Sequence, residues 1–497
     1  MTPPRSSLRP FVALAVVALF GPAPSRVEAA DDLPNVVFIL ADDLGIDDLH
    51  CYGRADHATP NLDRLAARGA RFTSAYCGLS ICSASRAALM TGKSAARLHL
   101  TTYLPGRADA PSQKLLHPKI DRFLPESETT LAERFKALGY ATGIFGKWHL
   151  AGGPGTQSAP TDQGFDEAFL PPTDSEPSAT EGGKNEYAIT RKAIDFLQRK
   201  KDAPFFLYVA HHTPHIRLAA KPELIAKHED AFNPTYAAMI ETLDDTVGLL
   251  LDAIEREGLA RKTIVVFTSD NGGLHVLEGG DVPTHNSPFR AGKGYLYEGG
   301  LRVPLIVAWP DRIPAAVIDE PTVNMDFTPT LLELCGAPAP AEPGLDGASL
   351  APRLRGGPPL PPRAFPFHFP HYTNQGSRPA GSLREGDWKL IEHYEDGRLE
   401  LFDLAADPGE RTDLAPAQPD RAAAMRDRLA AWRSSIDAQP NTPNPDYDPA
   451  LAAPIYSHFD STNVPPRPTA AAMIPLFQAW RQHMNAAVAG GNRRARD

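Results

Sequence analysis

Between residues 35 and 309 the chain alternates apolar runs with amphipathic stretches. The apolar runs are continuous, as in strands buried on both faces of a parallel sheet, and lie at 35–41, 141–145, 205–210, 263–269 and 305–309. The stretches between them carry apolar residues at helical spacing, at 62–68, 129–136, 187–199 and 236–257. This alternation predicts an α/β fold whose large, mostly parallel central sheet is flanked by helices.

A different pattern follows a Pro-rich stretch that opens at Pro310. Short strand-like runs at 388–391 and 400–404 are joined by a turn, and a helix is predicted over 421–434. We therefore divide the chain into a catalytic domain (30–365), a smaller C-terminal antiparallel-sheet subdomain (366–435) and a Pro-rich extension (436–497). The extension has little periodicity before 470, which predicts extended chain, and ends in a helix over 475–487.

The first residues have the pattern of a targeting segment. Arg5 and Arg9 precede an apolar run at 11–20, and Val27-Glu28-Ala29 offers a small-residue cleavage site. The pattern predicts a signal peptide at 1–29 and an exported protein, periplasmic or secreted. The run is too short to span a membrane and no later stretch is long enough, so no membrane span is expected.

Composition is that of a globular enzyme, with 42% hydrophobic and 22% charged residues among 497. The formal net charge of −10 argues against nucleic acid as a partner, so an anionic ligand must be held by a few local cations. Four cysteines are too few for a disulfide framework at this length. A Cys51–Cys77 bridge is one option, whereas Cys335, in an apolar run, is predicted to be a core residue.

Polar clusters follow four of the predicted strands: Asp42-Asp43, Lys147 with His149, His215, and Asp270-Asn271. Ligands of open α/β sheets bind at the carboxyl ends of the strands, so distant positions should converge there. Each cluster alone has an ordinary explanation as a loop, but the four together predict one site. The three aspartates and the asparagine offer oxygen ligands, which suit Ca²⁺ or Mg²⁺ better than zinc.

The segment from Cys82 to Lys93 reads CSASRAALMTGK. A helix that begins near Ser83 places Cys82 at its N-terminus, where free N–H groups and the helix dipole favour an anion. Arg86, one turn later, can add a fixed positive charge at the same end. A nucleophile in such an electropositive hole suits sulfuryl or phosphoryl transfer. The alternative is a buried cysteine and a solvated arginine.

The segment resembles the signature of the type I sulfatases of the alkaline phosphatase superfamily, in which the cysteine is oxidised to formylglycine after synthesis. Ala84 replaces the proline of many members, and Lys93 replaces an arginine. The stretch GYATGIFGKWHL (139–150) resembles the second sulfatase signature. The motifs lie in family order from Asn35 to at least Glu410.

The resemblance implies a formylglycine-generating enzyme as a maturation partner. It also implies a calcium ion, rather than magnesium, at Asp42, Asp43, Asp270, Asn271 and the modified Cys82. In the implied reaction the hydrated aldehyde attacks sulfur with Asp270 as the base, and the sulfate then leaves residue 82 by elimination, which regenerates the aldehyde. The other implied site residues are Arg86 and Lys147 on the sulfate, His149 for the elimination, and His215 with Lys293 on the leaving alcohol. His211 and His212 would support the site from behind.

The expected substrate is a sulfated carbohydrate, with galactose or N-acetylgalactosamine sulfate as a first candidate. A sugar pocket is predicted from three sets of residues: 367–372, Arg378 with Arg384, and 97–102. Packing between domains is an equal explanation for them. The rival functions are a phosphonate or phosphate monoester hydrolase of the same fold and a catalytically silent carbohydrate-binding relative. The cysteine in C-x-A-x-R and the pair Lys147/His149 favour the sulfatase.

Overall fold

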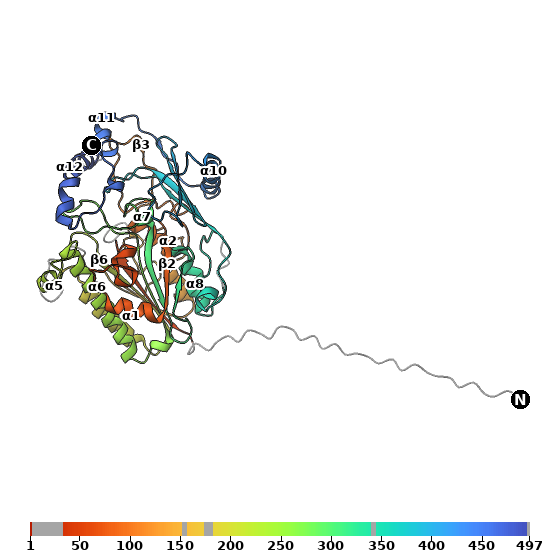
Figure 1. The fold of residues 1–497 in the computed structure, drawn as a ribbon. Helices are drawn as coiled ribbons and strands as arrows, with labels where there is room; N and C mark the ends of the chain where they lie inside the picture. Colours follow the sequence, from red (N-terminus) through yellow and green to blue (C-terminus); the bar gives the residue numbers. More distant parts are fainter. Residues whose placement is uncertain (2–32, 152–156, 173–181, 339–343, 495–497) are drawn as a thin grey trace.

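A large mixed sheet forms the centre of the molecule (Figure 1). The computed structural model describes residues 1, 33–151, 157–172, 182–338 and 344–494. Along the sheet the strands run β10 (Thr322–Val323), β2 (Ala70–Tyr76), β8 (Arg302–Ala308), β7 (Thr263–Ser269), β1 (Asn35–Asp42), β6 (Phe205–Pro214), β4 (Ala141–Gly146) and β5 (Glu167–Phe169), and β9 (Ala316–Ile318) pairs with β2. Only β8 is antiparallel to its neighbours, so the predicted mostly parallel sheet is confirmed.

Helices cover both faces of this sheet, as predicted (Figure 1). One face packs against α1 (Pro60–Arg68), α4 (Glu186–Lys200) and α6 (Pro234–Arg256). The other face packs against α2 (Cys82–Thr91), α3 (Leu131–Ala137), α8 (Phe327–Leu334) and α9 (Ala351–Leu354). The shorter helices α5 (Pro222–Lys227) and α7 (Glu298–Leu301) lie in connections between strands. In β1, Val36, Phe38 and Leu40 alternate with neighbours that face the opposite side, which is why the whole strand reads as apolar.

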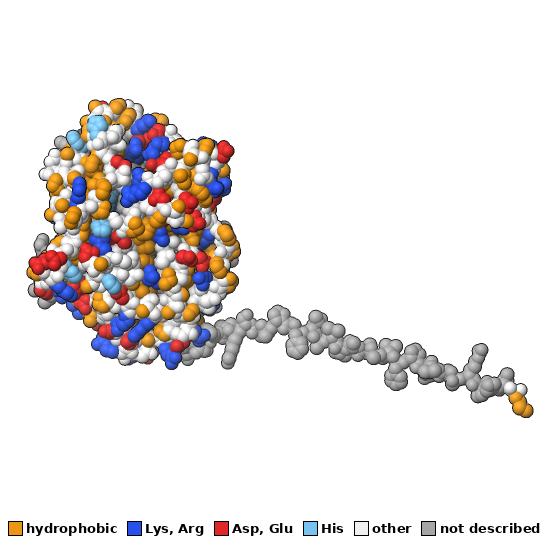
Figure 2. All heavy atoms as spheres, viewed as in Figure 1, with side chains coloured by type: hydrophobic (Ala, Val, Ile, Leu, Met, Phe, Trp, Pro, Cys, Tyr) orange, Lys and Arg blue, Asp and Glu red, His pale blue; other side chains and the backbone are white. Residues whose placement is uncertain are grey.

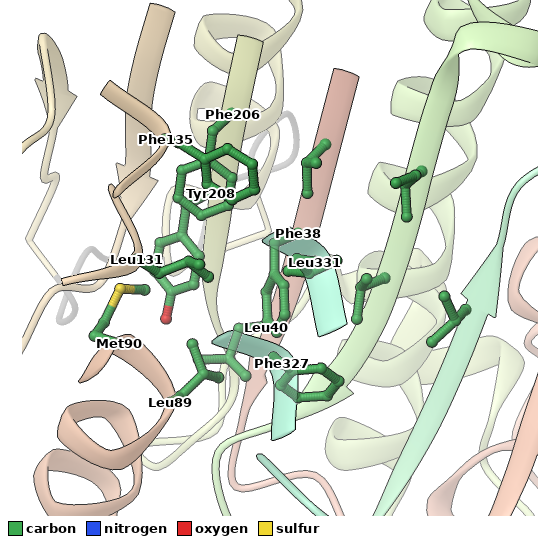
Figure 3. Close-up of a cluster of buried hydrophobic side chains, with 14 of the residues drawn as sticks. Phe38, Leu40, Leu89, Met90, Leu131, Phe135, Phe206, Tyr208, Phe327 and Leu331 are labelled. Atoms are coloured by element: carbon green, nitrogen blue, oxygen red, sulfur yellow. The ribbon is translucent and has the colours of Figure 1, made fainter. Parts of the chain in front are cut away.

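The core beside β1 fixes the position of α2 (Figure 3). Side chains of β1 and β6 meet side chains of α2, α3 and α8 there, among them Tyr208, Leu89, Met90, Phe135 and Phe327. Leu89 and Met90 belong to the last turns of α2 and are fully buried. Because this end of the helix is packed in the core, its other end is held rigidly and presents Cys82 at a set place.

A small antiparallel sheet packs on the catalytic domain. Its strands are β11 (Ala364–Phe369), β12 (Ala380–Glu385), β13 (Trp388–His393) and β14 (Leu399–Asp403). One face is covered by α10 (Pro419–Ser435), and Phe365, Phe367 and Phe369 on the other face pack against tyrosines that include Tyr76 and Tyr297. This sheet confirms the predicted antiparallel subdomain.

The C-terminal extension is more ordered than its composition predicts. Within 436–470 it forms β15 (Thr442–Pro443), which pairs with β3 (Leu115–Leu116), and α11 (Pro449–Tyr456). The last helix, α12 (Ala470–Arg494), begins five residues before Pro475 and packs with α11 on residues 274–282. Buried Phe477, Trp480 and Met484 explain this order, because they give the helix an apolar face.

Two further expectations concern the cysteines. All four cysteines are free, so the Cys51–Cys77 bridge is not formed, and Cys335 is a core residue as predicted.

Positive and negative side chains are interspersed over the face drawn in Figure 2. No helix in the described part of the chain is long and apolar enough to cross a membrane. The proposed signal peptide lies outside the described residues.

Candidate active site

The four polar clusters predicted from the sequence lie at the ends of four adjacent parallel strands. In the sheet these strands are ordered β7, β1, β6 and β4. They lead into Asp270-Asn271, Asp42-Asp43, His215 and Lys147 with His149, respectively. The parallel arrangement brings their carboxyl ends to one edge of the sheet.

Cys82 lies over the two aspartates that follow β1. Its Sγ is 3.7 Å from Oδ1 of Asp42 and 3.7 Å from Oδ1 of Asp43. Ligand atoms of Asp42, Asp43, Cys82 and His215 all lie within 4.8 Å of one another. Burial raises the pKa of the Cys82 thiol, so the unmodified side chain is a poor nucleophile.

Arg86 connects α2 to the ends of two strands. Its Nε donates to Oδ2 of Asp270 at 2.8 Å, and its Nη1 donates to the carbonyl oxygen of Lys147 at 2.9 Å. Its Nη2 lies 3.5 Å from Oδ1 of Asp42. The guanidinium is therefore buried among carboxylates, where it both holds the strand ends together and adds positive charge under Cys82.

Two lysines neutralise the aspartates after β1. Lys147 Nζ is 2.6 Å from Oδ2 of Asp42, and Lys293 Nζ is 2.7 Å from Oδ2 of Asp43. Burial alone would raise the pKa of Asp42, but the charges of Lys147, His215, Arg86 and Lys293 hold it well below its usual value. Both carboxylates are thus charged and available as oxygen ligands, and both ammonium groups are placed to meet an anion.

The donor set fits a hard divalent cation. Asn271 Nδ2 donates to Oδ1 of Asp43 at 2.8 Å, but its Oδ1 is buried without a hydrogen-bond donor in the described part of the chain. Burial raises the pKa of Asp270 to about 6, although Arg86 opposes the shift. An unpartnered amide oxygen beside three crowded carboxylates is a set of ligands that Ca²⁺ or Mg²⁺ would satisfy.

His149 presents an unprotonated nitrogen to the site. Its Nε2 donates to the carbonyl oxygen of Leu104 at 2.9 Å, and Nδ1 is buried without a described partner. Burial, helped by the charge of Lys147, lowers the pKa of His149 to about 3. The neighbouring Trp148 packs into the hydrophobic core. His149 is therefore a neutral imidazole that can accept a proton.

His215 lies on the opposite side of the aspartates, beside Lys293. Its Nδ1 donates to the carbonyl oxygen of Ile216 at 2.5 Å, and its Nε2 is 3.7 Å from Oδ2 of Asp43. Burial and the charge of Lys293 lower the pKa of His215 to about 4. Its side chain is 29% exposed, so Nε2 is the nitrogen that a substrate entering from solvent can meet.

Comparisons with known proteins identify the family. A family model described as sulfatase matches residues 34–337, and one described as the C-terminal part of N-sulphoglucosamine sulphohydrolase matches 291–434. Human arylsulfatase A is 32% identical over 82% of this chain and 88% of its own. The chain belongs to the sulfatase family. Its fold is that of the alkaline phosphatase superfamily.

Two further relatives have names that mention carbohydrates. Mouse N-acetylgalactosamine-6-sulfatase is 34% identical over 65% of this chain and 66% of its own. The crystal structure of Ps i-CgsB in complex with k-i-k-neocarrahexaose is 29% identical with a TM-score of 0.69, and the match covers 81% of this chain and 93% of that one.

A buried glutamate that the sequence analysis did not single out supports the end of β6 in this sulfatase family member. Glu186, at the start of α4, accepts from the backbone N–H of His212 at 2.9 Å and from the Thr213 hydroxyl at 2.7 Å, and it also pairs with His211. Acidic residues are ordinary in the first turn of a helix, so the pattern alone could not single it out. His211 and His212 thus lie behind the site, held by Glu186 and by the carbonyl oxygen of Lys184.

The predicted sugar-pocket residues gather only in part. Thr101 Oγ1 lies 2.9 Å from His371 Nε2, and Thr102 and His371 line one cavity, which joins the sets 97–102 and 367–372. The three arginines lie elsewhere. Arg97 forms an ion pair with Asp346, and Arg384 is buried against Tyr76. Arg378 pairs with Glu395 and lines a separate cavity of about 260 Å³. Packing between the catalytic domain and the antiparallel subdomain therefore accounts for Arg384, whereas Arg97 is held by an ion pair within the catalytic domain.

Proposed function

We propose that the chain is an exported sulfatase that hydrolyses sulfate monoesters of sulfated carbohydrates with a formylglycine formed from Cys82. The observation that carries this proposal is the position of Cys82 at the N-terminus of α2, over two aspartates that are paired with Lys147 and Lys293. A nucleophile in a pocket of fixed positive charges suits attack on a sulfuryl group.

The cofactor chemistry is assigned to residues that fit it. Asp42, Asp43, Asp270, Asn271 and modified residue 82 would hold a calcium ion, which supplies positive charge to the sulfate oxygens when bound. Formylglycine supplies, as its hydrate, a hydroxyl that can attack sulfur. Lys147, Lys293 and Arg86 are placed to bind the sulfate and to orient it against residue 82.

Proton transfers are assigned to the two sides of the site. Asp270, whose pKa burial raises to about 6, can accept a proton from the attacking hydroxyl. His215 and Lys293 both approach Oδ2 of Asp43. The charged ammonium of Lys293 would supply the proton, and the neutral Nε2 of His215 would relay it to the departing alcohol oxygen. His149, with its free Nδ1, would take a proton from residue 82 as the sulfate is released.

The substrate assignment draws on the relatives and on the N-terminal sequence. The names of the relatives include N-acetylgalactosamine-6-sulfatase and a complex with a neocarrahexaose, which supports a sulfated galactose or N-acetylgalactosamine unit. The predicted signal peptide at 1–29 supports export, where such polysaccharides are met.

Mass spectrometry and a desulfation screen test this function. In protein from a host with a formylglycine-generating enzyme, the tryptic peptide 72–86 should carry an aldehyde and be roughly 18 Da lighter than the cysteine form, because oxygen replaces sulfur and two hydrogens are lost. The same preparation should release sulfate from mono- and disaccharide sulfates. An intact thiol at residue 82, or no release from any sulfate ester, would contradict the proposal.

Metal removal is expected to lower activity and stability together. EDTA should reduce turnover of p-nitrophenyl sulfate by at least about 100-fold, and Ca²⁺ should restore it and raise Tm, because the folded state alone offers the binding site. Asp42→Asn should lower activity and abolish the Tm response, whereas Asp252→Asn, on the exposed side of α6, should change neither. Full activity in an exhaustively metal-free preparation would refute the metal assignment.

A further inference from the structure

Two arginines from distant parts of the chain meet next to the catalytic centre. Arg107 Nη1 donates to the carbonyl oxygen of Thr373 at 3.0 Å, and Arg481 Nη1 donates to that of Asn374 at 2.8 Å. The two carbonyls are consecutive, so the guanidinium groups are neighbours. Burial lowers the pKa of Arg481, and the charge of Arg107 lowers it further. The fold therefore places two like charges side by side.

Most of the hydrogen-bonding capacity of this pair is unused. Arg481 is 8% exposed, and its Nε and Nη2, like those of Arg107, are buried without an acceptor in the described ranges. Glu278 is 3.9 Å from Arg481 Nη2, and its carboxylate already accepts from Gln375 Nε2 at 2.6 Å. Buried cations with unpaired N–H groups are costly, so the arrangement is suited to a bound anion.

The pair adjoins residues of the active site. A Cβ added to Gly294, which follows Lys293, would lie 3.0 Å from both Thr373 Oγ1 and Gln375 Oε1, so the 373–375 loop packs directly against the catalytic segment. Burial and the charge of Glu278 raise the pKa of Tyr103, whereas the charges of Arg107 and Lys293 lower it. Tyr103 is therefore within electrostatic reach of both Arg107 and Lys293.

There is room for a sugar on the side of Arg107. Arg107 lines a cavity of about 610 Å³, together with Lys119, Arg122, Asp109 and Asp446. A cavity of this size is within the range of small-ligand sites, which is about 300–1,000 Å³. Pro105 also lines this cavity, and the carbonyl oxygen of the residue before it, Leu104, accepts a hydrogen bond from His149 Nε2. The cavity therefore begins close to the catalytic histidine.

We propose that Arg107 and Arg481 form a second anion-binding subsite, and that the substrate is a sulfated carbohydrate with a further sulfate or carboxylate beside the ester that is cleaved. The inference rests on the proposed function, of which it specifies the substrate class. Guanidinium groups bind such oxyanions through paired N–H donors. Arg481 lies in α12, past residue 434 where the second matched family model ends, so this subsite depends on the C-terminal extension.

Competition against p-nitrophenyl sulfate hydrolysis tests the subsite. The probes are N-acetylgalactosamine 6-sulfate with one anionic group, the 4,6-disulfate with a second sulfate, and the glucuronyl disaccharide of the 6-sulfate with a carboxylate. At least one doubly charged probe should bind about tenfold tighter than the monosulfate, and the one that does identifies the second group. The affinity ratio between that probe and the monosulfate is the quantity to follow. Arg107→Gln and Arg481→Gln should each remove most of this ratio.

Control variants separate binding from folding. Arg467→Gln removes an exposed arginine just before α12 and should preserve the ratio, and Arg481→Lys should retain part of it because the charge is kept. Equal affinity for all three probes in the wild type, or an unchanged ratio in both glutamine variants at normal Tm, would overturn the proposal. Turnover of p-nitrophenyl sulfate reports separately on the proposed function. If turnover fails, calorimetry with the same probes still measures the ratio.

Discussion

Cys82→Ala is expected to abolish sulfate ester hydrolysis, with a fall in kcat/KM on the order of 10⁴–10⁶-fold, while Tm stays nearly unchanged. A loss of this size is typical when an enzyme loses its nucleophile. Stability should persist because Sγ contacts two aspartates and not the apolar core. Turnover of p-nitrophenyl sulfate and thermal unfolding of the same preparation measure the two effects.

Cys335→Ala is the matched control for this experiment. It removes the same atom from a cysteine that is 2% exposed in the hydrophobic core. We expect full turnover and a stability loss of about 1 kcal/mol, the reverse of the Cys82 result. Hydrolysis at the wild-type rate by Cys82→Ala would end the formylglycine interpretation.

His215→Ala should discriminate between substrates by their leaving groups. A sugar alkoxide needs a proton to depart. The kcat of the variant on a sugar sulfate should therefore fall by about 10²–10⁴-fold. An aryl sulfate, whose phenolate departs unaided, should lose far less. Steady-state kinetics on a galactose sulfate and on p-nitrophenyl sulfate give the comparison, with His50→Ala as an exposed-histidine control that should affect neither.

His149→Ala should affect both substrates alike. If His149 assists release of sulfate from residue 82, the variant should accumulate a covalent adduct on the peptide that contains this residue. The adduct should be roughly 80 Da heavier than the hydrated aldehyde peptide, from the mass of SO₃. Equal losses on the two substrates for His215→Ala, without an adduct in the His149 variant, would show that the two roles are wrongly assigned.

The catalytic fold could be predicted because its strands are buried on both faces. A strand such as β1 must be apolar throughout, and such runs stand out against amphipathic helices. The order of strands in the sheet could not be predicted, because no local pattern encodes which strands pair. The extension was misjudged for a related reason: α11 and α12 depend on apolar contacts with residues 274–282.

The centre of the site was predictable because motifs follow strand ends. Asp42, Lys147 and Asp270 each come within a residue or two after an apolar run, and parallel strands bring such positions together. Glu186 and Arg481 carry no such mark. Their roles arise from tertiary contacts, Glu186 with the end of β6 and Arg481 with the 373–375 loop.

The burial of Cys82 has a consequence for the production of the protein. In the folded chain this residue is 2% exposed and lies near Lys147 and Lys293. A modifying enzyme has to take a segment of substrate into its own cleft, and α2 cannot leave the core without disrupting the packing of Leu89 and Met90. The proposed oxidation of Cys82 would therefore compete in time with folding, and a thiol that escaped it would stay buried. Slower synthesis or more modifying enzyme should raise the active fraction of a preparation without changing its yield.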